Sequence, residues 1–181
     1  PAHEFGLPGG VFISPGHVWA NVTVPGMVRV GLDDFARKMI GRIDAIDLPA
    51  KGATIKKGER LFSIRQGGRT AVFHAPTSGQ IHEVNAELPK HLDWLSRRPY
   101  EHGWVCSMKP EHLADELGQL YIGEKAAEWY QAEIVRLQDM LGASHGEAQV
   151  SPAPAGGLVE GQLEAADDAM WSKFTQGFLQ A

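Results

Sequence analysis

Hydrophobic and polar residues alternate in short runs over residues 17–110, and turn signals separate these runs. Alternation with a period of two is typical of half-buried β-strands, so the pattern predicts a mainly β domain there. The clearest hairpin lies in residues 61–84, where Gln66-Gly67-Gly68-Arg69 separates two half-apolar runs. A Gly-Gly pair at such a place predicts a tight type I′ turn, because both central residues of that turn need φ above zero.

One stretch of this β region changes to a helical period. Apolar residues over 32–41 recur at the spacing of one helix face, which predicts a short internal helix. Asp33 and Asp34 lie near its start and Arg37 and Lys38 near its end, as the helix dipole favours. Gly41 is placed to end the helix.

The flanking segments have other patterns. Residues 1–16 are rich in Gly and Pro and predict an extended lead-in, with a short strand possible at Val11-Phe12-Ile13. Residues 111–142 have helical periodicity and predict a helical extension that is interrupted near Gly123. Residues 143–157 are rich in Gly, Ala, Ser and Pro, which predicts a flexible linker.

Residues 158–181 regain an amphipathic helical pattern. An isolated helix of this size is marginal in water, so the apolar face needs a partner surface. We expect a docking helix that lies in a groove of another protein. The alternatives are that it folds back on its own domain or stays disordered. The partner-docking residues would be Leu163, Met170, Trp171, Phe174 and Phe178.

Composition narrows the possible functions. The net charge is −5 and the 17 basic residues are scattered, which argues against a nucleic-acid partner. No apolar run is long enough for a direct membrane span. Cys106 is the single cysteine, so no intrachain disulfide can form, and a cytoplasmic location is predicted. The eight histidines lack metal-ligand spacing, and we predict no metal, no cofactor and no catalytic residue.

Several short motifs in the β region resemble those of the glycine cleavage system H proteins, a family of lipoyl carriers. They occur in the family's order, over about residues 14–110. The resemblance implies a barrel-sandwich hybrid, a lipoyl-domain-like flattened β-sandwich with a short internal helix. The motifs are His17-Val18-Trp19, Gly31-Leu32-Asp33-Asp34-Phe35-Ala36, Ala75-Pro76-Thr77-Ser78-Gly79, Glu83-Val84-Asn85, Pro99-Tyr100 and Gly103-Trp104.

The same resemblance implies a lysine at the hairpin tip, where lipoate is attached through an amide. Counting back from Pro76 without gaps puts that position at Gly68, and no lysine lies between Lys57 and Lys90. Arginine remains protonated and does not form this amide. The hairpin tip therefore reads as a degenerate lipoyl-attachment site, comprising Arg65, Gln66, Gly67, Gly68 and Arg69.

Two interpretations of this tip remain open. It is either a tight turn with solvated arginines, or a binding loop in which Arg65 and Arg69 flank exposed backbone N–H groups and receive an anion. The leading hypothesis for the chain is a non-catalytic, H-protein-like module, a structural or adaptor subunit of a multi-protein metabolic or redox complex. The alternatives are a functional lipoyl or acyl carrier and an anion-binding regulatory module.

Overall fold

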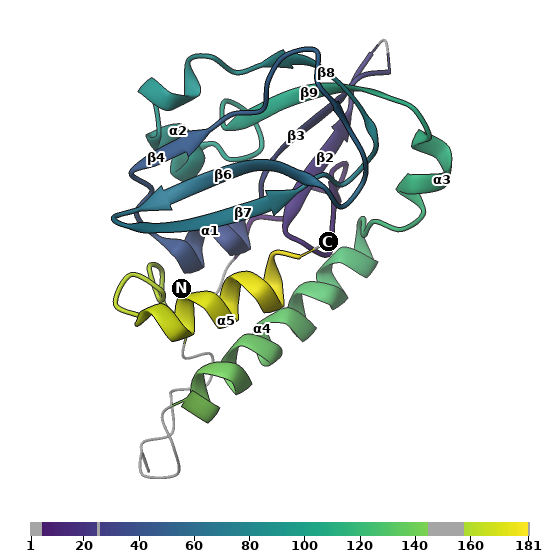
Figure 1. Cartoon of the computed structure of the whole chain (residues 1–181). Coiled ribbons are helices and arrows are strands. Elements are labelled where there is room, and N and C mark those ends of the chain that lie inside the picture. The colour runs from purple at the N-terminus through teal and green to yellow at the C-terminus, as the bar shows by residue number, and fades with distance from the viewer. Residues whose placement is uncertain (1–4, 25, 145–157, 181) are drawn as a thin grey trace.

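Two antiparallel sheets form the body of the protein in the computed structural model, which describes residues 5–24, 26–144 and 158–180 (Figure 1). The larger sheet contains, in spatial order, β1 (Phe12–Ile13), β2 (Val18–Val22), β3 (Val28–Leu32), β9 (Trp104–Pro110), β8 (Gly79–Val84) and β5 (Thr54–Ile55). The smaller sheet contains β4 (Ala45–Asp47), β6 (Arg60–Gln66) and β7 (Arg69–His74). The predicted mainly β fold with a flattened sandwich is confirmed.

Alternating side chains explain how the sheets enclose the core. In β3, Val28 and Val30 are fully buried while Arg29 between them is exposed, because neighbouring side chains on a strand point to opposite faces. Phe62 and Phe73 pair across β6 and β7, and their rings stack with centroids 4.9 Å apart. Both rings are buried, so the smaller sheet contributes its aromatic face to the same core.

The predicted internal helix is confirmed as α1 (Asp34–Ile40). Asp33 is its N-cap, and Asp33 Oδ1 accepts a hydrogen bond from the Ala36 amide at 2.9 Å. Gly41, with φ of 78°, ends the helix as expected. Leu32 differs from the expectation, because it pairs with Val18 as the last residue of β3. A 3₁₀ turn, η1 (Leu88–Lys90), and α2 (Asp93–Arg97) follow β8.

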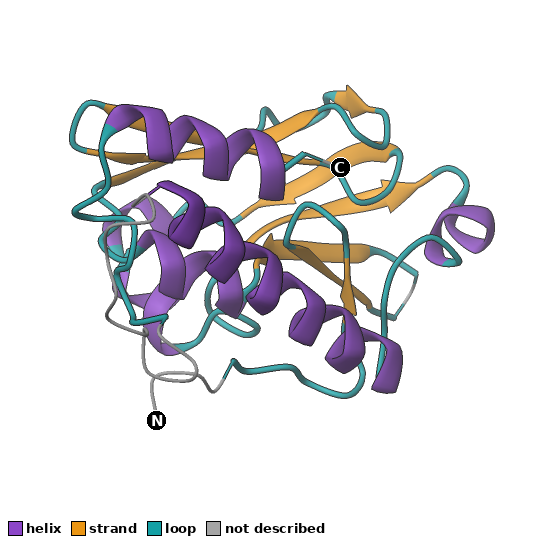
Figure 2. Cartoon of the chain, turned by 90° about the horizontal axis from the view of Figure 1, so that it is seen from below, coloured by secondary structure: helices purple, strands orange, loops and turns teal. Residues whose placement is uncertain are grey.

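Two helices, α3 (Leu113–Leu117) and α4 (Glu124–Ser144), form the predicted helical extension. Gly123 lies between them with φ of 62°, a conformation that suits glycine. The face of α4 toward the body is buried at Ala126, Tyr130, Glu133 and Leu137. Figures 1 and 2 show α1, α4 and α5 (Asp168–Phe178) on one side of the sheets. In the described part of the chain, no helix is long and apolar enough to cross a bilayer.

The predicted docking helix folds back on its own domain. All five residues expected to contact another protein are buried in this chain's own core, which corrects that expectation: Leu163, Met170, Trp171, Phe174 and Phe178. The physical reason is that α1 and the smaller sheet offer a complementary apolar surface, on which Phe178 stacks with Phe35 at 6.2 Å between ring centroids. The predicted linker, 143–157, lies outside the described residues apart from the last two residues of α4.

Candidate functional site

The tip of the β6–β7 hairpin is a two-residue turn. Gln66 pairs with Arg69, so Gly67 and Gly68 are its two central residues. The φ of Gly67 is 58°, whereas Gly68 lies outside the left-handed region. This sign pattern is that of a type II′ turn, which needs glycine only at its first central position. The prediction of a tight hairpin is confirmed, and the type I′ assignment is corrected.

Gln66 joins the hairpin to the end of α1. Its side chain is almost completely buried, and its Nε2 donates to the carbonyl oxygens of Ile40 and Arg42 at 2.7 and 2.8 Å. Carbonyl groups at a helix C-terminus lack partners within the helix, so this amide satisfies acceptors that burial would otherwise leave unpaired. Its Oε1 accepts a hydrogen bond from Arg69 Nη2 at 2.6 Å.

Arg69 is engaged by the C-terminal part of the chain. Residues 158–179, here called the C-terminal cover, lie against the hairpin and α1. Arg69 Nη1 donates to the carbonyl oxygen of Ala166 at 2.5 Å, and Nη2 donates to that of Leu163 at 3.0 Å. The guanidinium carbon lies 4.4 Å from the ring centroid of Trp171, within the range of a cation–π contact. Arg69 therefore joins the tip to the cover.

Further hydrogen bonds join α5 to the hairpin and to α4. Trp171 Nε1 donates to the Thr70 carbonyl at 3.0 Å. His74 Nδ1 donates to the Leu179 carbonyl, also at 3.0 Å. From α4, Arg136 Nη1 donates to the Gly177 carbonyl at 2.7 Å. The cover is thus attached along its length, through its backbone carbonyls and through the Trp171 side chain.

The start of the cover caps α1. The amides of Gly161 and Leu163 donate to the carbonyls of Lys38 and Met39 at 2.6 and 2.9 Å, which supplies two of the donors that the helix end lacks. A Cβ on Gly41 would lie 2.7 Å from the Gly161 Cα. The close approach of the two backbones therefore requires glycine at position 41.

The surroundings of the turn favour the interpretation as a tight turn over the interpretation as an anion-binding loop. The Gly67 amide donates to Asp44 Oδ2 at 2.7 Å, and this hydrogen bond, with a further contribution from Arg42, lowers the pKa of Asp44. Arg65 Nε lies 3.3 Å from Asp47 Oδ2 in a half-exposed ion pair. Since Arg69 is occupied by carbonyl oxygens, an incoming anion would meet carboxylates and engaged arginines.

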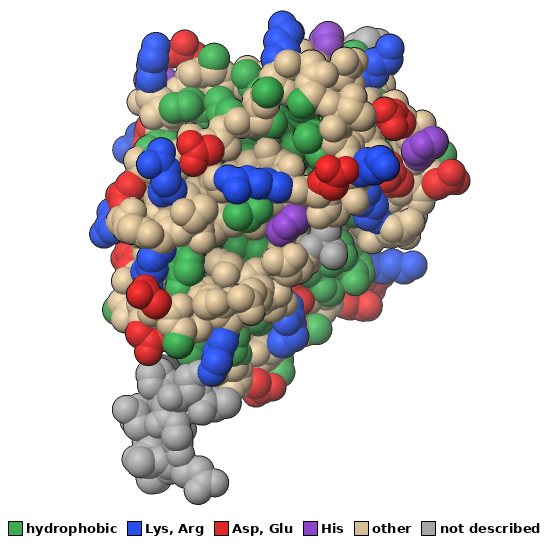
Figure 3. Space-filling model, viewed as in Figure 1, with side chains coloured by type: hydrophobic (Ala, Val, Ile, Leu, Met, Phe, Trp, Pro, Cys, Tyr) green, Lys and Arg blue, Asp and Glu red, His purple; other side chains and the backbone are tan. Residues whose placement is uncertain are grey.

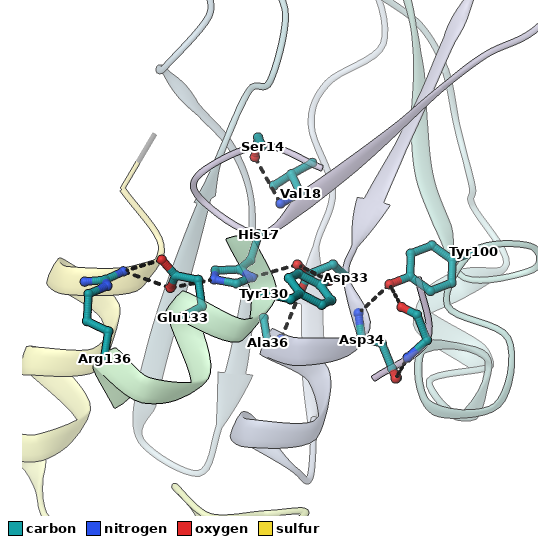
Figure 4. Close-up of polar contacts among 11 residues, drawn as sticks. Ser14, His17, Val18, Asp33, Asp34, Ala36, Tyr100, Tyr130, Glu133 and Arg136 are labelled. Atoms are coloured by element: carbon teal, nitrogen blue, oxygen red, sulfur yellow. Dashed lines mark hydrogen bonds and ion pairs between the residues drawn. The ribbon is translucent and has the colours of Figure 1, made fainter. Parts of the chain in front are cut away.

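A second polar cluster lies in the interior between the body and α4 (Figure 4). His17 is fully buried; its Nδ1 lies 2.6 Å from Asp33 Oδ2, and its Nε2 lies 3.2 Å from Glu133 Oε2. Both partners are carboxylates, so both ring nitrogens donate and the ring is cationic. Burial alone would lower the pKa of His17, but Asp33 and Glu133 together raise it to about 9.

The cluster extends beyond this histidine. The Tyr130 hydroxyl donates to Asp33 Oδ2 at 2.7 Å. Burial would raise the pKa of Glu133, but His17 and Arg136 outweigh burial and lower it. Arg136 Nη2 lies 2.9 Å from Glu133 Oε2, and the same guanidinium reaches the cover at Gly177. We call His17, Asp33, Tyr130, Glu133 and Arg136 the His17 cluster; it connects the start of β2, the start of α1, α4 and α5.

Sequence reasoning singled out His17 only as part of a motif and missed its partners. Glu133 is 116 positions away along the chain, and no local pattern connects the two. One backbone feature marks the position: His17 has φ of 65°, which is uncommon for a residue other than glycine. The cluster is closed to solvent at the histidine, and its groups satisfy one another, so it links the elements that contribute its side chains.

The remaining candidate groups are the lone thiol and the potential metal ligands. Cys106 is buried, and burial raises the pKa of its thiol to about 12, so little thiolate forms near neutral pH. Within the described ranges, no group of three or more His, Cys, Asp and Glu side chains is arranged to hold a metal ion.

The comparisons with known proteins agree on one family. The family model described as "Glycine cleavage H-protein" matches residues 12–133. A probable glycine cleavage system H protein of Pyrococcus abyssi is 36% identical over 126 residues, which cover 70% of this chain and 93% of the relative. A probable glycine cleavage system H protein 2 of Saccharolobus solfataricus is 33% identical over 124 residues, covering 68% of this chain and 78% of the relative.

A solved structure shares the fold. The crystal structure of a glycine cleavage system H protein from Mycobacterium marinum superposes with a TM-score of 0.55 at 28% sequence identity. The superposition covers 62% of this chain and 98% of that chain. The family match ends at residue 133, within α4, so the hairpin tip lies inside the shared region and the C-terminal cover lies beyond it.

Proposed function

The chain belongs to the glycine cleavage H-protein family, and from this premise we propose that it is a member without a lipoyl arm that works as a non-catalytic adaptor or structural subunit. The observation that carries the proposal is the hairpin tip. Gly68 stands where the family resemblance places the attachment lysine, and no lysine lies between Lys57 and Lys90. A chain with this hairpin offers no amine there for the amide to lipoate.

The contacts of Arg69, the residue that follows Gly68, support the same proposal. A swinging arm needs a tip that projects freely from the body. Here Arg69, next to Gly68, is bound to the carbonyl oxygens of Leu163 and Ala166 and lies on Trp171. The tip thus serves to hold the cover, which is a structural task in place of a carrier's task.

The partners that we propose are proteins. The relatives are named for the glycine cleavage system, so the other proteins of such a system, or of a related metabolic or redox complex, are the first candidates. Charged side chains of both signs are interspersed on the face drawn in Figure 3, which fits protein surfaces better than a nucleic-acid footprint. We further propose a cytoplasmic location.

Intact-mass spectrometry of the protein purified from its native source tests the proposal. We expect a mass that fits the unmodified chain. A relative with a tip lysine, produced in the same cells, is the positive control and should carry the lipoyl group. A lipoyl-sized mass increase on this chain would overturn the proposal, and peptide mapping would then identify the modified lysine.

A further inference from the structure

Two adjacent hollows lie in the surface between α1 and α2. The larger cavity has a volume of about 590 Å³ and the smaller about 270 Å³. Arg37 and Ser96 line both, so the two are adjacent, and together they are here called the α1–α2 groove. The larger cavity has an apolar wall made of Phe5, Pro99 and Tyr100.

Arg37, at the centre of this groove, has an unused donor. Its side chain is 9% exposed. Nη2 lies 3.2 Å from Asp34 Oδ1, and Nη1 is hydrogen-bonded to Glu160 Oε1. Nε is buried and has no hydrogen-bond partner among the described residues. Buried N–H groups without an acceptor are rare in folded proteins, and each one calls for an explanation.

The charge around the larger cavity favours an anion. Its lining includes three cationic side chains, Arg37, Lys38 and Arg97, and one carboxylate, Asp34. Asp34 is already shared, because its oxygens also accept from the Gly6 amide at 2.6 Å and pair with Lys38 at 3.0 Å. Arg97 is exposed and forms no ion pair with any described residue. The smaller cavity adds Arg42 and the carboxylates of Asp93 and Glu160, so the whole groove keeps an excess of one positive charge, which favours the approach of anions.

We propose that the α1–α2 groove binds a small organic carboxylate, which Arg37 and Arg97 receive. Two carboxylates already sit on the terminal nitrogens of Arg37, which shows that planar carboxylates suit this guanidinium. The apolar wall suits the organic part of such a ligand. Glu160, which belongs to the C-terminal cover and is 60% exposed, competes with the ligand for Arg37. The inference is independent of whether the hairpin carries a lipoyl arm.

Titration of the full-length protein with benzoate tests the proposal, because its ring fits an apolar wall and its carboxylate fits the guanidinium. Amide chemical shifts recorded by NMR should change in a saturable manner at Arg37, Ser96 and Arg97. Inorganic phosphate, titrated in parallel, should bind more weakly. The absence of saturable shifts with benzoate, or tighter binding of phosphate, would overturn the proposal.

Three substitutions separate a specific site from general charge attraction. Arg97→Gln should weaken benzoate binding about two- to five-fold, the range expected for one exposed charge. Arg98→Gln is the matched control, since Arg98 is the next residue and is exposed, but it pairs with Glu101 at 3.1 Å and lines neither cavity; it should leave binding unchanged. Glu160→Gln should strengthen binding by removing the competitor. Equal effects at positions 97 and 98, or weaker binding in Glu160→Gln, would contradict the proposed site.

Discussion

Two polar contacts hold the C-terminal part of this chain, and they are built in different ways. The His17 cluster is an interior arrangement in which a cationic ring lies between Asp33 and Glu133. Arg69 instead lies near the surface and binds carbonyl oxygens and the face of Trp171. The first depends on particular side chains from both partners, whereas the second depends on the side chains of Arg69 and Trp171 and otherwise on backbone carbonyls.

The two contacts differ in which positions tolerate a change of side chain. Any residue supplies a carbonyl oxygen, so the side chains at positions 164–166 can change without removing the acceptors of Arg69. In the His17 cluster, removal of one partner leaves buried charges without compensation. The tip contact therefore requires particular side chains only at Arg69 and Trp171, whereas the interior cluster requires them at every position.

The largest effect is expected for His17→Asn. Asparagine tolerates the positive φ at this position but removes the cation between two buried carboxylates. We expect the free energy of unfolding, measured by chemical denaturation, to fall by about 3–5 kcal/mol. His82→Asn is the matched control, because His82 is exposed on β8; its change should stay within about 0.5 kcal/mol. Equal losses in the two variants would contradict the role of the cluster.

The same histidine predicts a pH dependence. Its pKa is about 9 in the folded protein and near the ordinary histidine value of 6.5 in the unfolded chain. The folded protein therefore keeps a proton that the unfolded chain releases, so this contribution is complete below pH 6.5 and declines as pH rises to about 9. The free energy of unfolding should decline by a total on the order of 3 kcal/mol. Chemical denaturation at a series of pH values measures this decline. His17→Asn should flatten this part of the profile, and an unchanged slope would argue against a cationic ring.

A smaller effect is expected at the hairpin tip, where substitution of Arg69 can be compared with substitution of the nearby Arg65. Arg69→Ala leaves the Gln66 Oε1 and three carbonyls of the cover without this donor, and should reduce stability by about 1–3 kcal/mol. Arg65→Ala removes only a half-exposed pair with Asp47 and should cost about 0–1 kcal/mol. Hydrogen exchange should accelerate in residues 158–179 of the first variant alone. Unchanged exchange there would show that Arg69 does not hold the cover.

Much of the fold was predictable because its signals are local. The two half-apolar runs of β6 and β7 and the Gly-Gly pair between them predict the hairpin, and the helical period with Asp33 and Gly41 predicts α1. The sign of φ at Gly68 was not predictable, since type I′ and type II′ turns both accept a Gly-Gly pair.

The partners of the candidate site could not be predicted in the same way. Arg69 contacts a carbonyl 97 positions later at Ala166, and such backbone acceptors leave no mark in the sequence. The amphipathic pattern of α5 correctly indicates a buried face, but it does not say which protein supplies the opposing surface. The chain itself supplies it through α1 and the smaller sheet.

The smallest effect on stability, and the sharpest test of the tip, comes from placing a lysine in the turn. Both central glycines have open space where a Cβ would be, but only Gly67 has a left-handed φ. Gly67→Lys should therefore cost about 1–2 kcal/mol, while Gly68→Lys should stay within about 0.5 kcal/mol. Incubated with lipoate and a lipoate-attaching enzyme, Gly68→Lys should gain a lipoyl-sized mass that the parent chain does not gain. If Gly68→Lys stays unmodified although it is fully folded, the lysine alone does not explain the missing arm. The cover held by Arg69 then becomes the second barrier, and Gly68→Lys combined with Arg69→Ala should be modified.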